Sequence, residues 1–366
     1  MYSMKTKITK KSLSVINKTV VEPYFHIYDS LQQGMKDNLY RVSDETFTSD
    51  EAKRWQFSKQ FMPEEVQKVI RKEHLRCFSI DIGFENHITF SVRWFVRTDK
   101  KLSNELLDKL LRALSSMIVM SRYGNCNLKN KKIVLRMFDT NIKKCFPAVG
   151  QTIGPEHVNS AYTVPCKYST SSELEIVIFR EEEWQKVLFH ELMHTYSLDI
   201  GLDTSFIKRS LSEIFDGLDC KFNLTEAYCE FWARTIWTIV NSPDSYEKQL
   251  GLLAKQQEWA IRQAANVLLR MPQNPKSCYE RTSAFSYYVI TALLLSAFPS
   301  TIEWCERNCE HLLAFPDTQQ GVKSFLQLID NIVKSETIRA KWDTYLKLSG
   351  NKIASMEPVT SKMSYV

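Results

Sequence analysis

A five-residue segment, His190-Glu191-Leu192-Met193-His194, carries the residue types that chemistry at a metal ion requires. Residues four apart on an α-helix differ by about 40° around its axis, so both imidazoles would point the same way. Two such nitrogens are typical ligands of Zn²⁺. The Glu191 carboxylate would reach a water instead of the ion, and in sites of this kind it serves as general base. The pattern therefore predicts a catalytic zinc site.

A catalytic zinc site needs a third protein ligand and leaves one position for water. The metzincin class would have glycine at position 197 and histidine at position 200, but the sequence has Ser197 and Ile200, which excludes that class. A carboxylate further along the chain is the other source. Residues 223–234 predict a helix with Glu226 and Glu230 four residues apart on one face.

The motif, followed by a helix that reads Glu-x-x-x-Glu-Phe-Trp-Ala, resembles the gluzincin branch of zinc metallopeptidases over roughly residues 130–240. Residues 158–232 are also similar to zincin-like proteins encoded by large DNA viruses, which implies a viral origin. The resemblance implies a zincin-like fold, one Zn²⁺ per chain and hydrolysis of peptide bonds in a protein or peptide substrate. Carried over by position, it implies zinc ligands at His190, His194 and Glu226, with Glu191 as general base. Glu230 would orient a histidine, as such sites usually require.

A second interpretation of Glu226 stays open. Asn223 followed by a glutamate three residues later also matches a capping box, in which Glu226 would accept a hydrogen bond from a backbone N–H. Glu230 would then be the third ligand. The sequence therefore leaves two candidates for this position.

Peptide hydrolysis also needs a donor for the oxyanion of the tetrahedral intermediate. Tyr287 and Tyr288, on the apolar segment 283–295, are the candidates chosen here, with Tyr196 and Tyr228 as further options. The alternative for each is an amphipathic tyrosine of the core. Substrate binding is expected at an edge strand that adds a peptide to the sheet, formed by Ser160, Ala161 and Tyr162.

Hydrophobic periodicity predicts the elements that position these residues. Strands are expected in a hairpin over 77–97 and at 133–138, 160–164 and 175–179; helices are expected at 51–61, 63–75, 102–121, 181–198, 206–215, 224–240, 245–271, 278–298 and 322–348. This order predicts an α+β fold: a zincin-like mixed sheet with an active-site helix, then a largely α-helical C-terminal region. We expect three parts, namely a mainly helical extension (1–75), the catalytic core (76–240) and a helical subdomain (241–366).

Composition limits the remaining classes. A chain of 366 residues with 44% hydrophobic residues is too apolar for disorder, and only 10 glycines and 11 prolines exclude a collagen-like chain. We find neither a secretory signal nor an apolar run of membrane length, and nine cysteines without framework spacing favour reduced thiols, so a cytoplasmic protein is expected. Cys305, Cys309 and His311 are close in sequence, but no fourth ligand lies nearby.

Two other functions compete with the peptidase. A catalytically inactive protein of the same fold would hold a partner without cutting it. A basic module would bind nucleic acid through the lysines of residues 5–18, but a net charge of +6 does not demand such a partner and a solvated terminus is preferred.

Overall fold

The computed structural model describes residues 10–201, 204–242, 245–271, 277–353 and 359–365. Two compact units divide the chain. The sheet unit comprises residues 18–143 and 159–198. The helical unit comprises the described residues of 1–17, 144–158 and 199–366.

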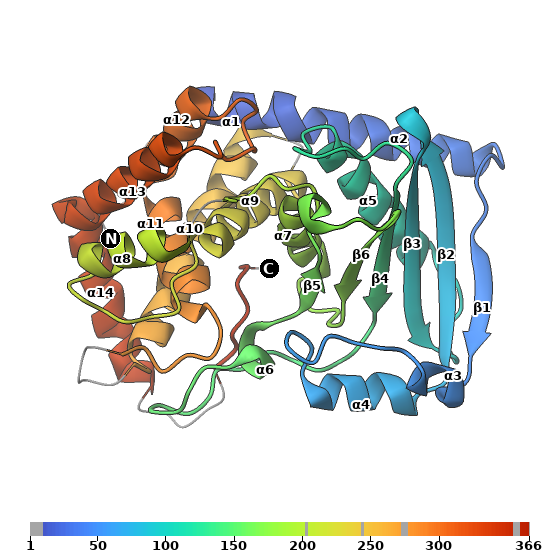
Figure 1. Ribbon diagram of the computed structural model, residues 1–366, viewed down its shortest axis with the longest axis horizontal. Helices are drawn as coiled ribbons and strands as arrows, with labels where there is room; N and C mark the ends of the chain where they lie inside the picture. Colours follow the sequence, from blue (N-terminus) through green and yellow to red (C-terminus); the bar gives the residue numbers. More distant parts are fainter. Residues whose placement is uncertain (1–9, 202–203, 243–244, 272–276, 354–358, 366) are drawn as a thin grey trace. The chain divides into compact units, whose positions relative to one another are not determined.

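The sheet unit is built on a mixed sheet (Figure 1). Within the described residues, six strands lie in the order β1 (Ser43–Phe47), β2 (Leu75–Phe84), β3 (Ile88–Arg97), β4 (Lys132–Phe138), β6 (Glu173–Ile178) and β5 (Ala161–Thr163). Strands β3, β4 and β6 are parallel neighbours, whereas the β1–β2, β2–β3 and β6–β5 pairs are antiparallel. The mixed α+β class and the β2–β3 hairpin are thus confirmed.

Helices cover both faces of this sheet. α4 (Glu64–Lys72) packs Val66 and Ile70 into an apolar cluster that includes Phe95 of β3. The next residue back along β3, Trp94, meets Trp184 of α7 (Trp184–Thr195) edge to face, with ring centroids 4.9 Å apart. Because successive side chains of a strand point to opposite faces, α4 and α7 lie on opposite sides of the sheet.

The motif helix α7 lies among further helices on its face. It contacts β5, β6 and α5 (Asn104–Ser121), and α5 in turn contacts α2 (Glu22–Lys36) and β3. Three short helical segments also occur: the π-helix η1 (Asn17–Val21) and the 3₁₀ helices η2 (Glu85–His87) and η3 (Cys166–Tyr168).

The expected helix over 51–61 is much shorter in the structure. α3 (Ser49–Lys53) begins at a capping box between Thr48 and Glu51 and ends after about one turn. Trp55 and Phe57 then leave the helix and pack against the aromatic rings of Phe95 and Phe138. Burying these large rings in the cluster outweighs continuing an exposed helix.

The helical unit follows the expected all-helical pattern, but two of the predicted helices differ. Its elements are α1 (Lys10–Ile16), α6 (Pro155–Val158), α8 (Thr204–Ile214), α9 (Leu224–Val240), α10 (Tyr246–Leu268), η4 (Phe285–Ile290), α11 (Thr291–Ser296), α12 (Phe298–Asn308), α13 (Gln319–Lys334) and α14 (Glu336–Ile353). The helix expected over 278–298 begins only near residue 285, and its first part, η4, is a π-helix. The single helix expected over 322–348 is two helices, α13 and α14, because Ser335 between them has extended backbone.

Four cysteines correct the expectation of reduced thiols. Cys126 is joined to Cys166 in the sheet unit, and Cys220 to Cys278 in the helical unit. Sequence separations of 40 and 58 residues leave no local signal for either disulfide. Among the described residues, no single helix has the length and apolar character to cross a membrane. One pair of consecutive helical segments, η4–α11 followed by α12, has the length and composition of a membrane span when taken together, but the two segments are bent by 92° relative to each other.

Candidate metal centre

The motif helix begins where the backbone forces it to begin. Glu183 has φ of 61°, in the left-handed region that an α-helix of L-residues cannot continue. The helix therefore begins at Trp184, three residues later than the sequence pattern predicts. It ends at Thr195, and the predicted helix is otherwise confirmed.

The helix is held rigidly along its length. Leu188 and Leu192 are fully buried, and the Gln185 side chain donates to the Tyr24 hydroxyl at 3.1 Å. At the C-terminal end the Tyr196 hydroxyl donates to the carbonyl oxygen of Met117 in α5 at 2.8 Å. Burial raises the pKa of Tyr196 well above its usual value, so the hydroxyl keeps the proton that it donates.

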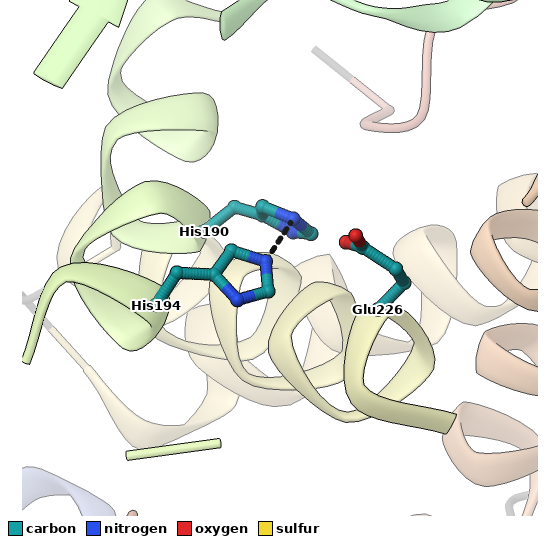
Figure 2. A group of neighbouring side chains, drawn as sticks. All are labelled: His190, His194 and Glu226. Atoms are coloured by element: carbon teal, nitrogen blue, oxygen red, sulfur yellow. Dashed lines mark hydrogen bonds between the residues drawn. The ribbon is translucent and has the colours of Figure 1, made fainter. Parts of the chain in front are cut away.

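The two histidines of the motif face each other across one turn of α7 (Figure 2). Their Nε2 atoms are 3.2 Å apart and their ring centroids 4.9 Å apart. His190 and Glu191 are buried and His194 is half-buried. Two nitrogens that each bind one tetrahedral zinc at about 2.05 Å would lie about 3.3 Å apart. The observed separation therefore fits a shared ion, and a pair of neutral imidazoles is the right donor chemistry.

The start of α9 decides how the Asn223 cap is made. The Asn223 side chain accepts a hydrogen bond from the Glu226 N–H at 3.4 Å. The Asn223 N–H, which the glutamate of a capping box would occupy, donates instead to the hydroxyl of Ser286 in η4 at 2.9 Å. The cap therefore does not require the Glu226 carboxylate, which weakens the alternative interpretation of this residue.

Figure 2 draws Glu226 with the two histidines, and its carboxylate completes one of the groups that could hold a metal ion. Two further groups occur in the described part of the chain: His194 with Asp199 and Cys229, and Cys220 with Cys278 and Glu280. Because Cys220 and Cys278 are joined in a disulfide, the second of these groups has no thiolate to bind a metal.

The sequence analysis did not single out Asp199 and Cys229, which form a possible metal-binding group with His194. Asp199 lies only five residues beyond His194, and that short spacing of a histidine and a carboxylate was the available signal. Glu230 belongs to none of the three groups found in the described residues. It is buried in an ion pair, accepting from Arg234 Nε at 2.8 Å. Its expected role in orienting a histidine stays a prediction.

The candidate tyrosines differ in their surroundings. The Tyr288 hydroxyl is buried and donates to the carbonyl oxygen of Ser361 at 2.7 Å, while Tyr287 is half-buried. The Tyr228 hydroxyl donates to the Leu313 carbonyl oxygen at 3.1 Å, as expected for a core tyrosine. A hydroxyl has a single proton, so Tyr288 can serve an oxyanion only after releasing Ser361.

Strand β5 places the expected substrate edge beside the motif helix. It stands at the end of the strand order, paired with β6 alone among the described strands. The hydroxyls of Thr163 in β5 and Thr195 in α7 lie 2.9 Å apart. The carbonyl oxygen of Ser160 accepts a hydrogen bond from the Phe179 N–H, and the ring of Tyr162 stacks on that of Phe61. Ser160, Ala161 and Tyr162 thus lie on the edge that was predicted, and their contact with substrate stays a prediction.

Comparison with known proteins adds no independent assignment. No protein-family model, no curated protein and no solved structure matches this chain. The function is therefore argued from the residues and their geometry.

Proposed function

We propose that the chain is a zinc-dependent peptidase whose ligands are His190, His194 and Glu226. The observation that carries this proposal is the pair of Nε2 atoms 3.2 Å apart on one rigidly packed helix. The grouping of the Glu226 carboxylate with that pair supports the third ligand. Two imidazoles and one carboxylate form the donor set of one class of catalytic zinc sites, which keeps a fourth position for water.

Glu191 is the proposed general base. Zinc in such a site supplies a Lewis acid and lowers the pKa of water. Glu191 takes the proton from the attacking water and passes it to the leaving amine. Its side chain is 7% exposed, so bulk water has little access to the proton that it carries. A peptide added to the free edge of β5 would present its backbone to this helix.

The first test replaces the base alone. Glu191→Gln keeps the shape of the side chain but removes its basicity, and we expect zinc content near wild type with turnover lowered about 10²–10⁴-fold. Turnover is measured on a broad peptide library, and zinc by elemental analysis. Glu173→Gln, at an exposed glutamate of β6, is the matched control and should keep full turnover. Wild-type rates in Glu191→Gln would disprove the mechanism.

The second test identifies the third ligand. Purified wild-type protein should contain about one zinc per chain, Glu226→Ala should lose it and Glu230→Gln should retain it. Glutamine is chosen at position 230 because its amide oxygen can still accept from Arg234 Nε, whereas alanine would remove the acceptor as well as the charge. Loss of zinc in Glu230→Gln alone would exchange the roles of the two glutamates. Zinc without turnover of any peptide would favour the catalytically inactive interaction protein.

A further inference from the structure

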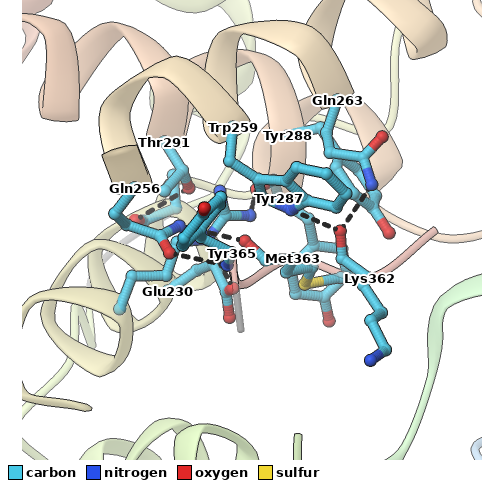
Figure 3. Close-up of polar contacts among 12 residues, drawn as sticks. Glu230, Gln256, Trp259, Gln263, Tyr287, Tyr288, Thr291, Lys362, Met363 and Tyr365 are labelled. Carbon is cyan, nitrogen blue, oxygen red and sulfur yellow. Dashed lines mark hydrogen bonds and ion pairs between the residues drawn. The ribbon is translucent and has the colours of Figure 1, made fainter. Parts of the chain in front are cut away.

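The C-terminal residues 359–365, called the tail here, contact side chains of the helical unit and bend at residues 363–364 (Figure 3). The tail first pairs with residues 144–146. Thr360 forms an antiparallel bridge with Cys145, and the Phe146 N–H donates to the Val359 carbonyl oxygen at 2.9 Å. The Ser361 N–H donates to the Lys144 carbonyl oxygen at 3.2 Å, so this part is held as a strand would be.

Helix α10 then supplies side chains to the tail backbone. Gln256, Trp259 and Gln263 have the i, i+3, i+7 spacing of a single helix face. Gln263 donates to the carbonyl oxygens of residues 360 and 362 at 3.0 and 2.6 Å, and Trp259 donates to that of residue 362 at 3.1 Å. Gln256 donates to the carbonyl of residue 363 at 3.1 Å and accepts from the N–H of residue 365 at 3.0 Å.

The Tyr288 hydroxyl donates to the Ser361 carbonyl oxygen. With this contact, every carbonyl oxygen from residue 359 to residue 363 accepts a hydrogen bond. The donors recognise backbone, which every peptide has. Side chains add selectivity, since Ser361 and Ser364 are fully buried and Met363 is 4% exposed. Tyr365 remains 43% exposed, with Lys255 over its ring at 5.5 Å.

Four polar side chains donate to the backbone of the tail. Two amides, an indole N–H and a phenol can all bond to water when the tail leaves, so these donors need not remain unsatisfied. An apolar wall would lack this alternative and would favour permanent burial. The arrangement therefore suits an occupant that comes and goes.

We infer that this part of the helical unit is a peptide-binding site and that the tail occupies it as an intramolecular ligand. A peptide that presents a methionine followed by serine, with a second serine two residues before the methionine, can replace the tail. Peptide binding does not depend on zinc. One consequence rests on the proposed function: release of the tail breaks the hydrogen bond from the hydroxyl of Tyr288, the expected oxyanion donor, to the Ser361 carbonyl oxygen.

The test uses the full chain with residues 354–358 replaced by a protease recognition site. The protein is folded, treated with chelator and then cut, so that the tail is held only by its contacts. A fluorescent peptide of residues 359–366 is added and its anisotropy measured. We expect saturable binding, displaced by the same peptide without label. The uncut protein is the control and should bind the label more weakly, because the tethered tail competes.

Two substitutions make the test specific. Gln263→Ala removes two hydrogen bonds, so peptide binding should weaken about tenfold. Glu258→Ala, at an exposed residue of the same helix, should leave binding unchanged. A peptide with Met363→Asp would bury a charge and should bind at least about tenfold more weakly.

A cut protein that retains its tail and neither binds nor exchanges the label would overturn the inference, because the tail would then be a permanent part of the fold. Equal binding of the Met363→Asp peptide would also overturn it. The binding experiment is done without metal. Its result therefore tests the peptide-binding site even if the peptidase proposal fails.

Discussion

At the scale of single residues, Glu280 links folding to pH. Burial raises the pKa of this carboxyl from 4.5 to about 7, although the N–H groups of Lys221 and Phe285 donate to it at 2.6 and 2.8 Å and limit the rise. The folded-state pKa lies above the unfolded value, so the native chain binds more protons between these two pH values. Stability is therefore expected to fall as pH rises from about 4.5 to about 7.

Glu280→Gln removes this titration, and we expect a flatter pH dependence in the variant. The difference in unfolding free energy between pH 4.5 and pH 7.5 should be smaller than in wild type by on the order of 2–3 kcal/mol. Denaturant unfolding at both pH values measures this difference for each protein. Because the substitution's own effect on stability is present at both pH values, it cancels when the two differences are compared. Identical pH dependence in the two proteins would contradict this assignment.

Much of the candidate site could be predicted residue by residue. The four-residue spacing alone predicts that His190 and His194 lie on one helix face. In the structure their Nε2 atoms are 3.2 Å apart, which confirms this prediction. The choice between Glu226 and Glu230 could not be made in this way. Two contacts bear on it: the Ser286 hydroxyl accepts from the Asn223 N–H, 63 residues away in sequence, and Arg234 pairs with Glu230. The third ligand itself stays a prediction.

At the scale of elements, the N-cap of α9 is expected to control the third ligand. Asn223→Ala removes the acceptor for the Glu226 N–H and should destabilise the protein by about 1 kcal/mol. Ser103→Ala removes the matching cap of α5, where the serine accepts from the Leu106 N–H at 3.1 Å, at a similar cost. Only Asn223→Ala frees the turn that carries Glu226, so only this variant should bind zinc more weakly. Zinc titration of both variants measures this, and equal affinities would refute it.

Elements with strong periodicity were predictable, and those set by distant contacts were not. The hairpin and α7 follow their apolar patterns. β1 was not predicted because Ser43–Phe47 is a largely exposed, polar edge strand without an alternating apolar pattern. Backbone pairing with β2 holds it in the sheet. The helix over 51–61 was predicted too long because Trp55 and Phe57 find aromatic partners in the sheet.

At the scale of the whole molecule, docking of the tail lay beyond sequence patterns. Its hydrogen bonds join residues about 100 positions apart, for example Gln263 with Thr360 and Trp259 with Lys362. A glutamine on a helix and a polar C-terminal segment each read as solvated surface by themselves. Only the folded helical unit brings the amides and the carbonyls together.

Zinc should stabilise the native chain by mass action, because the ligands come together only in the folded state. At a free zinc concentration of a hundred times Kd the gain is about 2.7 kcal/mol, which corresponds to several degrees in the midpoint of a large chain. Calorimetry is the suitable measurement, since two compact units need not unfold in one step. The affected transition should move upward with zinc and downward with chelator. His194→Gln should abolish the shift, whereas His74→Gln, at an exposed histidine, should preserve it. A wild-type midpoint that does not change with zinc would show that the native chain does not bind the metal, and the proposed hydrolysis would lose its basis.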